Sequence, residues 1–375
     1  MIEVGRTTHP QPTLAERLRA RIRREGPITF RDWMEAALYD PEGGYYRRAD
    51  LTRWGRAGDY RTSPERSPLF AATLARYFAS RFDELGAPAQ FKIIEAGAGD
   101  GQFARGVCET LRRDFPHVLA SLRYLIDEPS EDSRRRIERN LSAFTGLYEF
   151  IRIDQPGGPL GEGIVFSNEL LDALPVHRIR WRGGKLWELR VGLNQAGAFA
   201  WREREPSTPR LAEYVEHEAI TLAEGQSAEV NFAAGEWLAR AASILTCGYV
   251  VTVDYGAEAA ELYHARQRPD GTLRAFRNHQ IVDDVLARPG EQDLTTTIDW
   301  THIRRAGESV GLRPVSFARQ DQFLLRAGLL EQLELLTTHA PSEAEALALR
   351  LAARDLLLPG GMGQSFQVLV QRKDP

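Results

Sequence analysis

The chain has 375 residues, of which 43% are hydrophobic and 27% are charged, and its formal net charge at pH 7 is −4. This balance is that of an ordinary globular protein and gives no general attraction to nucleic acid or to an anionic membrane. No apolar run is long enough to span a membrane, and the Arg-rich N-terminal segment contains acidic residues that a transit peptide would lack, such as Glu3 and Glu16. Cys108 and Cys247 lie in apolar contexts without metal-type spacing. We therefore expect a cytoplasmic protein with no metal site and no nucleic-acid or membrane partner.

The N-terminal part of the chain predicts a helical extension. Apolar residues repeat at helical spacing from Leu14 to Ile22, and Thr29 is placed to cap a second helix. Tyr45 and Tyr46 follow a turn, where they either pack that turn onto the body or belong to a site. Both alternatives stay open.

A polar loop with Thr62 and Ser63 precedes a helix that is expected to begin near Pro68. Because the loop stands just ahead of a glycine-rich strand end, its hydroxyls are candidates for covering a bound ligand. The alternative is a turn whose hydroxyls bond to their own backbone, and one sequence does not separate the two.

Residues 91–101 form the most informative stretch of the chain. An apolar, β-branched run predicts a buried strand that ends at Glu95, and Gly97, Gly99 and Gly101 follow at alternate positions. The residues after them have helical spacing. Strand, glycine-rich turn and helix together allow a backbone to approach a ligand closely.

The spacing of these glycines indicates the kind of ligand. A dinucleotide fingerprint has its third glycine one position later and places a phosphate on the helix N-terminus. Here Glu95 ends the strand, and a carboxylate suits a cationic group better than a phosphate. The pattern is similar to the first motif of S-adenosylmethionine-dependent methyltransferases. The alternative is a tight strand-to-helix turn that binds no ligand.

Two further strand ends supply candidate ligand-binding acids. The strand expected at 122–126 is followed by Asp127 and Glu128, and acid at this place in a βαβ unit binds ribose hydroxyls, with Glu128 preferred. A third strand ends before Asp154, a weaker candidate for an adenine amine. The acid after the strand at 122–126 could instead belong to an ordinary helix start.

The fourth predicted strand, residues 163–167, ends in Asn168 and Glu169. Ligands of an open parallel sheet bind outside the carboxyl ends of its strands, which places these two side chains beside the glycine turn. Asp172 would share a face with Glu169 if the segment is helical. Two carboxylates on one face can hold a guanidinium or ammonium group. The alternative is a pair of acids that simply favour a helix start.

After residue 177 the pattern changes to an antiparallel hairpin with further helices, and a fifth core strand follows at about 248–256. Residues 271–279 form a basic loop that either lines a substrate entrance or is an ordinary hairpin. We expect an α/β protein in four parts. They are an N-terminal helical extension with the covering loop (1–85), the first part of the core (86–177), an inserted α+β substrate-side region (178–247) and the second part of the core (248–375).

Several sequence blocks in a fixed order carry a resemblance to a known family. Together they resemble the MidA-like family of S-adenosylmethionine-dependent methyltransferases over nearly the full chain. The blocks are residues 26–30 with 39–46, 58–59 with 62–65, the Glu95 glycine turn, 128–130, 167–169 with 172–177, 254–256, 271–273 and 361–363.

The resemblance implies a Rossmann-like class I methyltransferase sheet, S-adenosyl-L-methionine as cofactor and, for the mitochondrial branch of the family, methylation of protein arginine. It also implies site residues, carried over by position. Asn168 and Glu169 would face the methyl acceptor, with Asp172 in support. The cofactor would be bound by Glu95, Gly97, Gly99, Gly101 and Glu128, and covered by Thr62 and Ser63.

We therefore expect an enzyme that methylates a nitrogen, most simply an arginine guanidinium in a protein substrate. One alternative is a cofactor-binding factor that assists assembly of a protein complex without transferring a methyl group. A nicotinamide oxidoreductase is a weaker alternative, because the glycine spacing differs from the dinucleotide fingerprint.

Overall fold

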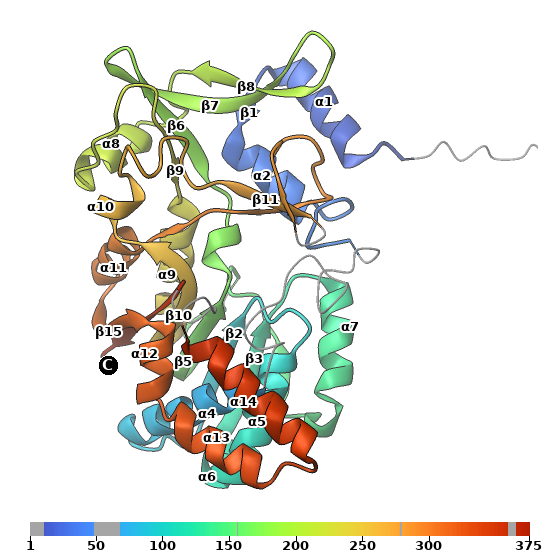
Figure 1. Ribbon diagram of the computed structural model, residues 1–375, viewed down its shortest axis with the longest axis vertical. Helices are drawn as coiled ribbons and strands as arrows, with labels where there is room; N and C mark the ends of the chain where they lie inside the picture. The colour runs from blue at the N-terminus through green and yellow to red at the C-terminus, as the bar shows by residue number, and fades with distance from the viewer. Residues whose placement is uncertain (1–10, 49–67, 156, 278–279, 359–364) are drawn as a thin grey trace, which may run out of the picture.

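The chain folds around one large mixed sheet, as the computed structural model shows (Figure 1). The structure describes residues 11–48, 68–155, 157–277, 280–358 and 365–375.

The order of strands in the main sheet is β4-β3-β2-β5-β10-β16-β15, and β14 pairs with β10. Strands β2 to β5 and β10 run parallel, whereas β16 is antiparallel to both of its neighbours. This arrangement confirms the predicted Rossmann-like methyltransferase sheet. The strands are β2 (Phe91–Ala96), β3 (Leu122–Asp127), β4 (Tyr148–Phe150), β5 (Gly161–Asn168), β10 (Leu245–Ala257), β14 (Ile298–Asp299), β15 (Leu312–Arg319) and β16 (Phe366–Lys373).

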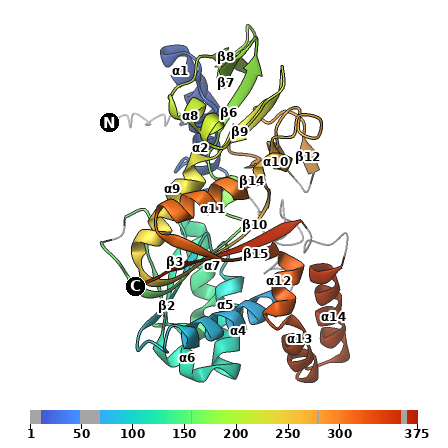
Figure 2. The same cartoon turned by 90° about the vertical axis from the view of Figure 1, so that its left-hand side faces the viewer.

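Helices cover both faces of this sheet (Figure 2). For that reason β5 is apolar in both directions, and Ile164, Val165 and Phe166 are all buried. One face is covered by α4 (Pro68–Glu84), α5 (Gln102–Asp114), α6 (Pro116–Ser121), α12 (Gln320–Arg326), α13 (Leu329–Thr338) and α14 (Glu343–Leu357). The other face is covered by α9 (Phe232–Ile244) and α11 (Trp300–Ser309), while α7 (Glu131–Asn140) packs beside α5.

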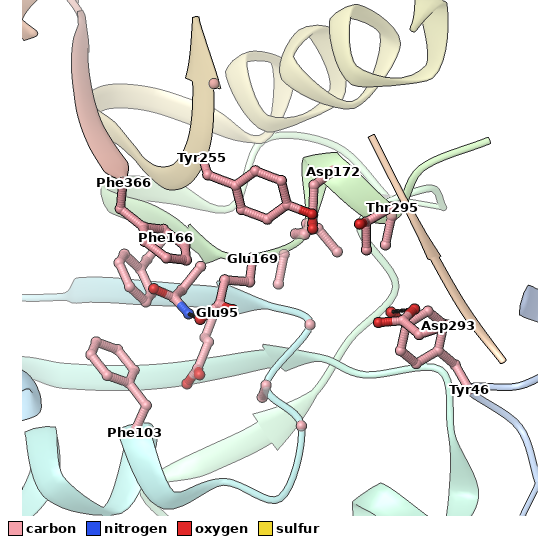
Figure 3. Close-up of a pocket in the computed structure, with 18 of the residues that line it drawn as sticks. Tyr46, Glu95, Phe103, Phe166, Glu169, Asp172, Tyr255, Asp293, Thr295 and Phe366 are labelled. Carbon is pink, nitrogen blue, oxygen red and sulfur yellow. Dashed lines mark hydrogen bonds between the residues drawn. The ribbon is translucent and has the colours of Figure 1, made fainter. Parts of the chain in front are cut away.

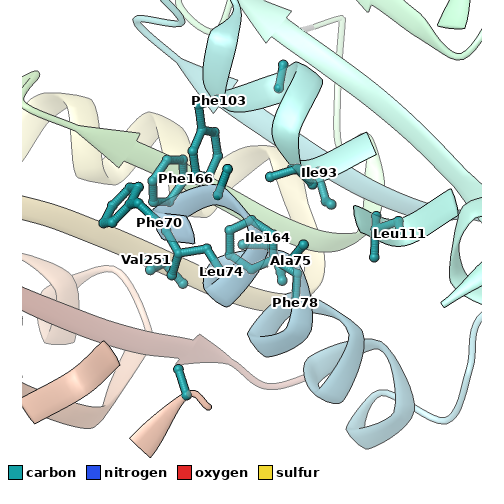
Figure 4. Close-up of a cluster of buried hydrophobic side chains, with 14 of the residues drawn as sticks. Phe70, Leu74, Ala75, Phe78, Ile93, Phe103, Leu111, Ile164, Phe166 and Val251 are labelled. Atoms are coloured by element: carbon teal, nitrogen blue, oxygen red, sulfur yellow. The ribbon is translucent and has the colours of Figure 1, made fainter. Parts of the chain in front are cut away.

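A group of phenylalanines joins α4 and α5 to the sheet (Figure 4). Phe103 stacks on Phe166 with ring centroids 4.4 Å apart, and the edge of Phe78 meets Phe166 at 5.7 Å. All three side chains are buried. The helix that follows the glycine turn is thus fixed to the strand that carries Asn168 and Glu169.

A second, antiparallel sheet has the order β1-β7-β6-β9, with β8 on β7. Its first strand comes from the N-terminal extension, since Ile28 pairs with Val191. Thr29 caps the following helix as predicted, accepting a hydrogen bond of 3.1 Å from the Asp32 amide. Its elements and helices are α1 (Leu14–Glu25), β1 (Ile28–Thr29), α2 (Phe30–Tyr39), β6 (His177–Arg182), β7 (Lys185–Leu193), β8 (Phe199–Arg204), α8 (Arg210–His217) and β9 (Ser227–Val230).

A third sheet lies in residues 258–297, which leave the main sheet after β10 and return to it with β14. Of the basic loop predicted at 271–279, residues Arg274–Arg277 form one strand of this sheet. Its elements are α10 (Ala259–Leu262), β11 (Arg274–Arg277), β12 (Gln280–Val282) and β13 (Asp293–Thr295), in the order β12-β11-β13.

The four-part division of the chain stays a prediction. The N-terminal extension and the hairpin of the inserted region share one sheet, and α9, which lies inside residues 178–247, packs on the main sheet with α11. Within the described ranges, no helix combines the length and apolar character that crossing a membrane requires.

Replacing Phe78 by alanine is expected to lower the free energy of unfolding by about 3–5 kcal/mol, because it leaves a cavity against Phe103 and Phe166. Urea unfolding followed by circular dichroism measures this change. Leu330→Ala is the matched control: this side chain is 55% exposed, so a change within about 0.5 kcal/mol is expected. Equal effects of the two substitutions would contradict the packing described.

Candidate functional site

A cavity of about 630 Å³ opens at the carboxyl ends of the parallel strands (Figure 3). Its floor is the glycine turn after β2 and the end of β5, and its other walls come from α2, the turn after it, and the third sheet. The site therefore lies at the carboxyl ends of the parallel strands, as expected for an open parallel sheet, between the main sheet, the third sheet and the N-terminal extension.

The glycine turn adopts a backbone that other residues rarely adopt. The φ angles of Gly97, Gly99 and Gly101 are +71°, +61° and +83°. A Cβ on Gly97 would lie 3.1 Å from Leu170 Cδ1, and one on Gly101 would lie 3.0 Å from Ile137 Cγ1. Gly97 and Gly99 line the cavity, whereas Gly101 packs against α7. The turn thus presents bare backbone to a ligand.

Glu95 lines the cavity from the end of β2 and is almost fully buried. The Tyr124 hydroxyl donates a hydrogen bond of 2.6 Å to its Oε2. Burial raises the pKa of Glu95 to about 8, although the bond from Tyr124 opposes this rise. The carboxyl group is therefore mostly protonated at neutral pH until a cation approaches it.

Glu128 follows β3, lines the same cavity and supports the glycine turn. Its Oε2 accepts a hydrogen bond of 3.2 Å from the Gly99 amide, and its Oε1 accepts one of 2.8 Å from the Ser130 amide. The structure thus brings Glu95, Glu128, Gly97 and Gly99 to one cavity, whereas Gly101 lies outside its wall.

The structure does not bring Asp154 to the cavity. It is half-exposed, its Oδ2 is 2.7 Å from Arg152 Nη2, and it is absent from the cavity wall. Its proposed contact with an adenine amine stays a prediction without geometric support. Thr62 and Ser63 lie outside the described residues.

Asn168 and Glu169 face the cavity at the end of β5. Asn168 Nδ2 donates a hydrogen bond of 3.0 Å to Glu169 Oε1, and the Glu169 amide donates one of 2.9 Å to the Val253 carbonyl. Glu169 has a φ of +52°, a left-handed conformation that is strained for a non-glycine residue. These two hydrogen bonds keep the Glu169 carboxylate at the end of β5 despite the strain of its backbone.

Asp172 lies in a short 3₁₀ turn, Leu171–Ala173, that does not include Glu169. The two residues therefore do not share a helical face, which was predicted only for a helical segment. Both carboxylates line the cavity nevertheless. Burial raises the pKa of Asp172 to about 6, and the nearby Tyr255 hydroxyl opposes this rise (Figure 3). Its Oδ1 is buried and has no hydrogen-bond partner among the described residues. Such a group is suited to a ligand that brings its own donors.

A second buried carboxyl group, Asp254, fixes this turn. Its Oδ2 accepts hydrogen bonds from the Leu171 and Asp172 amides, at 2.9 and 3.3 Å. Burial and the neighbouring Asp172 raise the pKa of Asp254 well above its ordinary value. Asp254 is outside the cavity wall, so it positions Asp172 and does not itself meet a ligand.

Further wall residues come from the N-terminal extension and the third sheet, and of these the sequence offered Tyr46 as one of two alternatives and did not predict Tyr39 or Asp293. The Tyr46 hydroxyl donates a hydrogen bond of 2.7 Å to Asp293 Oδ1, and both residues line the cavity (Figure 3). Tyr39 stacks on Tyr46 with centroids 5.5 Å apart. Tyr46 was left open between packing and a role in the site, and it does both, whereas Tyr45 is buried. No sequence signal pairs residues 247 positions apart.

Comparison with known proteins gives consistent matches over most of the chain. Residues 73–318 match the sequence model of a family described as an S-adenosyl-L-methionine-dependent methyltransferase. A mitochondrial protein arginine methyltransferase NDUFAF7 homolog of Drosophila melanogaster is 28% identical, over 95% of this chain and 84% of that protein. The mitochondrial protein arginine methyltransferase NDUFAF7 of Homo sapiens is 26% identical, over 96% of this chain and 83% of that protein.

A solved structure matches the fold closely. The crystal structure of a COG1565 superfamily member from Burkholderia thailandensis, bound to S-adenosyl-homocysteine, superposes with a TM-score of 0.86 at 32% sequence identity. The match covers 96% of this chain and 92% of that chain.

The residues of the cavity fit S-adenosylmethionine. The turn exposes bare backbone, and two carboxylates, Glu95 and Glu128, meet it, which suits an ammonium and ribose hydroxyls and disfavours a phosphate. We infer that Glu95, Glu128 and the turn hold the cofactor's methionine and ribose parts.

Gly99→Val is expected to abolish binding of S-adenosylmethionine. A β-branched side chain is strained at a φ of +61° and projects from the turn that lines the cavity. Isothermal titration calorimetry measures the affinity, and circular dichroism shows whether the variant is folded. A folded variant with native affinity would mean that this turn does not contact the cofactor.

Binding of the cofactor is expected to release a proton through Glu95. Below its pKa of about 8 the Glu95 carboxyl is mostly protonated, and a cationic ligand favours its ionised form. Between pH 6 and 7 the affinity should therefore rise with pH. Calorimetry in two buffers of different ionisation enthalpy counts the proton released. Glu95→Gln should remove both effects, and an unchanged proton count in that variant would assign the release elsewhere.

The expectation of a cytoplasmic location is wrong, because the curated relatives are mitochondrial proteins by name. The resemblance to MidA-like proteins, the sheet and the cofactor are confirmed by the family match and by the solved structure with S-adenosyl-homocysteine. The chain belongs to this family of S-adenosyl-L-methionine-dependent methyltransferases.

Proposed function

We propose that this methyltransferase transfers a methyl group to a guanidinium nitrogen of an arginine in a protein substrate. The relatives that match along nearly the whole chain are named protein arginine methyltransferases. Their names supply the acceptor class, and the charges of the cavity support it independently.

The observation that carries the proposal is the excess of carboxyl groups in the described cavity wall. A guanidinium is always charged in proteins and presents five N–H donors, so it needs several acceptors. The wall supplies seven carboxyl groups against two guanidinium groups: Glu95, Asp100, Glu128, Glu169, Asp172, Glu261 and Asp293 against Arg268 and Arg274.

Glu169 and Asp172 are the groups proposed to meet the acceptor. The Asn168 side chain donates a hydrogen bond to the Glu169 carboxylate. The turn that carries Asp172 is fixed by hydrogen bonds from the Leu171 and Asp172 amides to Asp254. Such fixed carboxylates are suited to orient a guanidinium. With a pKa of about 6, Asp172 is largely ionised at neutral pH and can accept a donor N–H.

When bound, S-adenosylmethionine supplies a methyl group on a sulfonium sulfur. The acceptor nitrogen must lose one proton as it gains this methyl group. In this proposal Glu169 or Asp172, which both line the cavity, accepts that proton. Catalysis then depends mainly on orientation of the acceptor nitrogen.

The second candidate, a cofactor-binding assembly factor without transfer activity, is not favoured. The cavity contains oriented carboxylates that cofactor binding alone does not require. A stable protein partner whose binding does not change in Glu169→Gln, together with absence of methyl transfer, would favour that candidate.

Glu169→Gln is expected to lower kcat by about 100-fold or more while leaving the affinity for S-adenosylmethionine unchanged, because the amide cannot accept a proton. Mass spectrometry of arginine-containing peptides incubated with labelled cofactor measures transfer and locates the methyl group. Calorimetry measures cofactor affinity.

The control for this experiment is Glu138→Gln, which changes an exposed carboxylate on α7 and should retain full activity. Full turnover by Glu169→Gln would show that the proposed role is wrong. Methyl groups found on a residue type other than arginine would overturn the proposed acceptor.

A further inference from the structure

Two arginine side chains line the cavity although most of its charged groups are acidic. Arg268 and Arg274 both come from the segment between β10 and β14. Neither forms an ion pair with a carboxylate anywhere in the described ranges, in contrast to Arg304 of α11, which is 2.6 Å from Glu258. Guanidinium groups in a cavity without a carboxylate partner are suited to an anionic ligand group.

Arg274 is held in place but retains hydrogen-bonding capacity. Its Nη2 donates a hydrogen bond of 3.3 Å to Thr297 Oγ1, and its guanidinium lies 5.1 Å from the centre of the Tyr255 ring. Its Nε is buried and has no hydrogen-bond partner in the described parts of the chain. The planar guanidinium is therefore oriented by Tyr255 and Thr297, as bidentate recognition of a carboxylate requires.

The position of Arg274 also creates an electrostatic problem for the proposed acceptor. Burial raises the pKa of Asp172, and Arg274 is among the groups that lower it, so the two charges interact. A substrate guanidinium that binds Asp172 meets Arg274 as a like charge. A negative group that enters with the substrate would offset this repulsion.

We propose that Arg274, assisted by Arg268, binds the carboxylate of an acidic residue next to the target arginine, so that the preferred substrate contains an Arg-Asp or Arg-Glu pair. The inference rests on the proposed function, and it adds the substrate class. The acidic part of the wall at Glu169 and Asp172 binds the guanidinium, and the basic part binds its neighbour.

A carboxylate could come from a second source, the methionine part of the cofactor. Arg274 packs on Tyr255 and its charge acts on Asp172, whereas it is not among the described groups that act on Glu95, which we assign to the methionine part. This placement favours the substrate as the source. The experiment below distinguishes the two.

Two peptides serve as probes, Gly-Gly-Arg-Asp-Gly-Gly and Gly-Gly-Arg-Asn-Gly-Gly. Calorimetric titration measures their affinity for the protein saturated with S-adenosylhomocysteine, so that no turnover is needed. The aspartate peptide should bind about tenfold more tightly at low ionic strength, since the pairing is electrostatic. Arg274→Gln should remove most of this preference, and Arg274→Lys should restore part of it.

Arg266→Gln is the matched control, because Arg266 is exposed, lies two positions from Arg268 and is not part of the cavity wall. It should keep the native preference. Retained affinity for S-adenosylhomocysteine shows that each variant is folded.

Three results would overturn the inference, each in a distinguishable way. Equal binding of the two peptides by the native protein would show that no acidic neighbour is recognised. A tenfold loss of affinity for S-adenosylhomocysteine in Arg274→Gln, with the peptide preference unchanged, would assign the arginine to the cofactor. If neither peptide binds while S-adenosylhomocysteine does, the proposed arginine acceptor fails, and the inference fails with it.

Discussion

The geometry of the turn that carries Asp172 depends on one buried carboxyl group, that of Asp254. Asp254, at the end of β10, accepts the backbone amides of Leu171 and Asp172, and these bonds form inside the protein where water cannot compete. The same turn accepts two further hydrogen bonds. Asn231 Nδ2 donates to the Leu171 carbonyl, and the Thr296 amide donates to the Asp172 carbonyl. A turn with bonds from three separate elements has little freedom to move. The Asp172 carboxylate, which we propose meets the acceptor, is therefore positioned by hydrogen bonds to the turn that carries it.

Burial of several carboxyl groups in one cavity has an energetic cost that a ligand can recover. Burial raises the pKa of Glu95 to about 8 and that of Asp172 to about 6, which means that their ionised forms are disfavoured in the free protein. A cationic ligand reverses this balance by pairing with the ionised form. The carboxyl groups of the cavity therefore favour ligands that bring a cationic group, such as the ammonium of S-adenosylmethionine.

The parts of the fold that follow from local patterns could be predicted from the sequence. The strand, glycine turn and helix at 91–114, the acid after β3 and the polar end of β5 depend on residue type and short spacing, and all were placed correctly. Features set by tertiary contact could not be predicted. The left-handed φ of Glu169 is imposed by its surroundings and has no propensity signal. Strand β15 was missed because its burial does not alternate regularly and it contains Pro314.

The N-terminal extension is part of the site and not an appendage to it. The Tyr39 hydroxyl donates a hydrogen bond of 3.0 Å to the Ala173 carbonyl, one residue beyond Asp172, and Tyr46 bonds to Asp293 of the third sheet. The extension therefore connects the acceptor turn of the main sheet with the wall that carries Arg274 and Asp293. The main sheet carries the glycine turn, Glu95 and Glu128, whereas the third sheet and the N-terminal extension complete the cavity wall. In the proposed function, the main sheet carries Glu169 and Asp172, and the surrounding elements add Arg274 and Asp293 to the same cavity, so changes in those elements are expected to alter substrate preference more than cofactor binding.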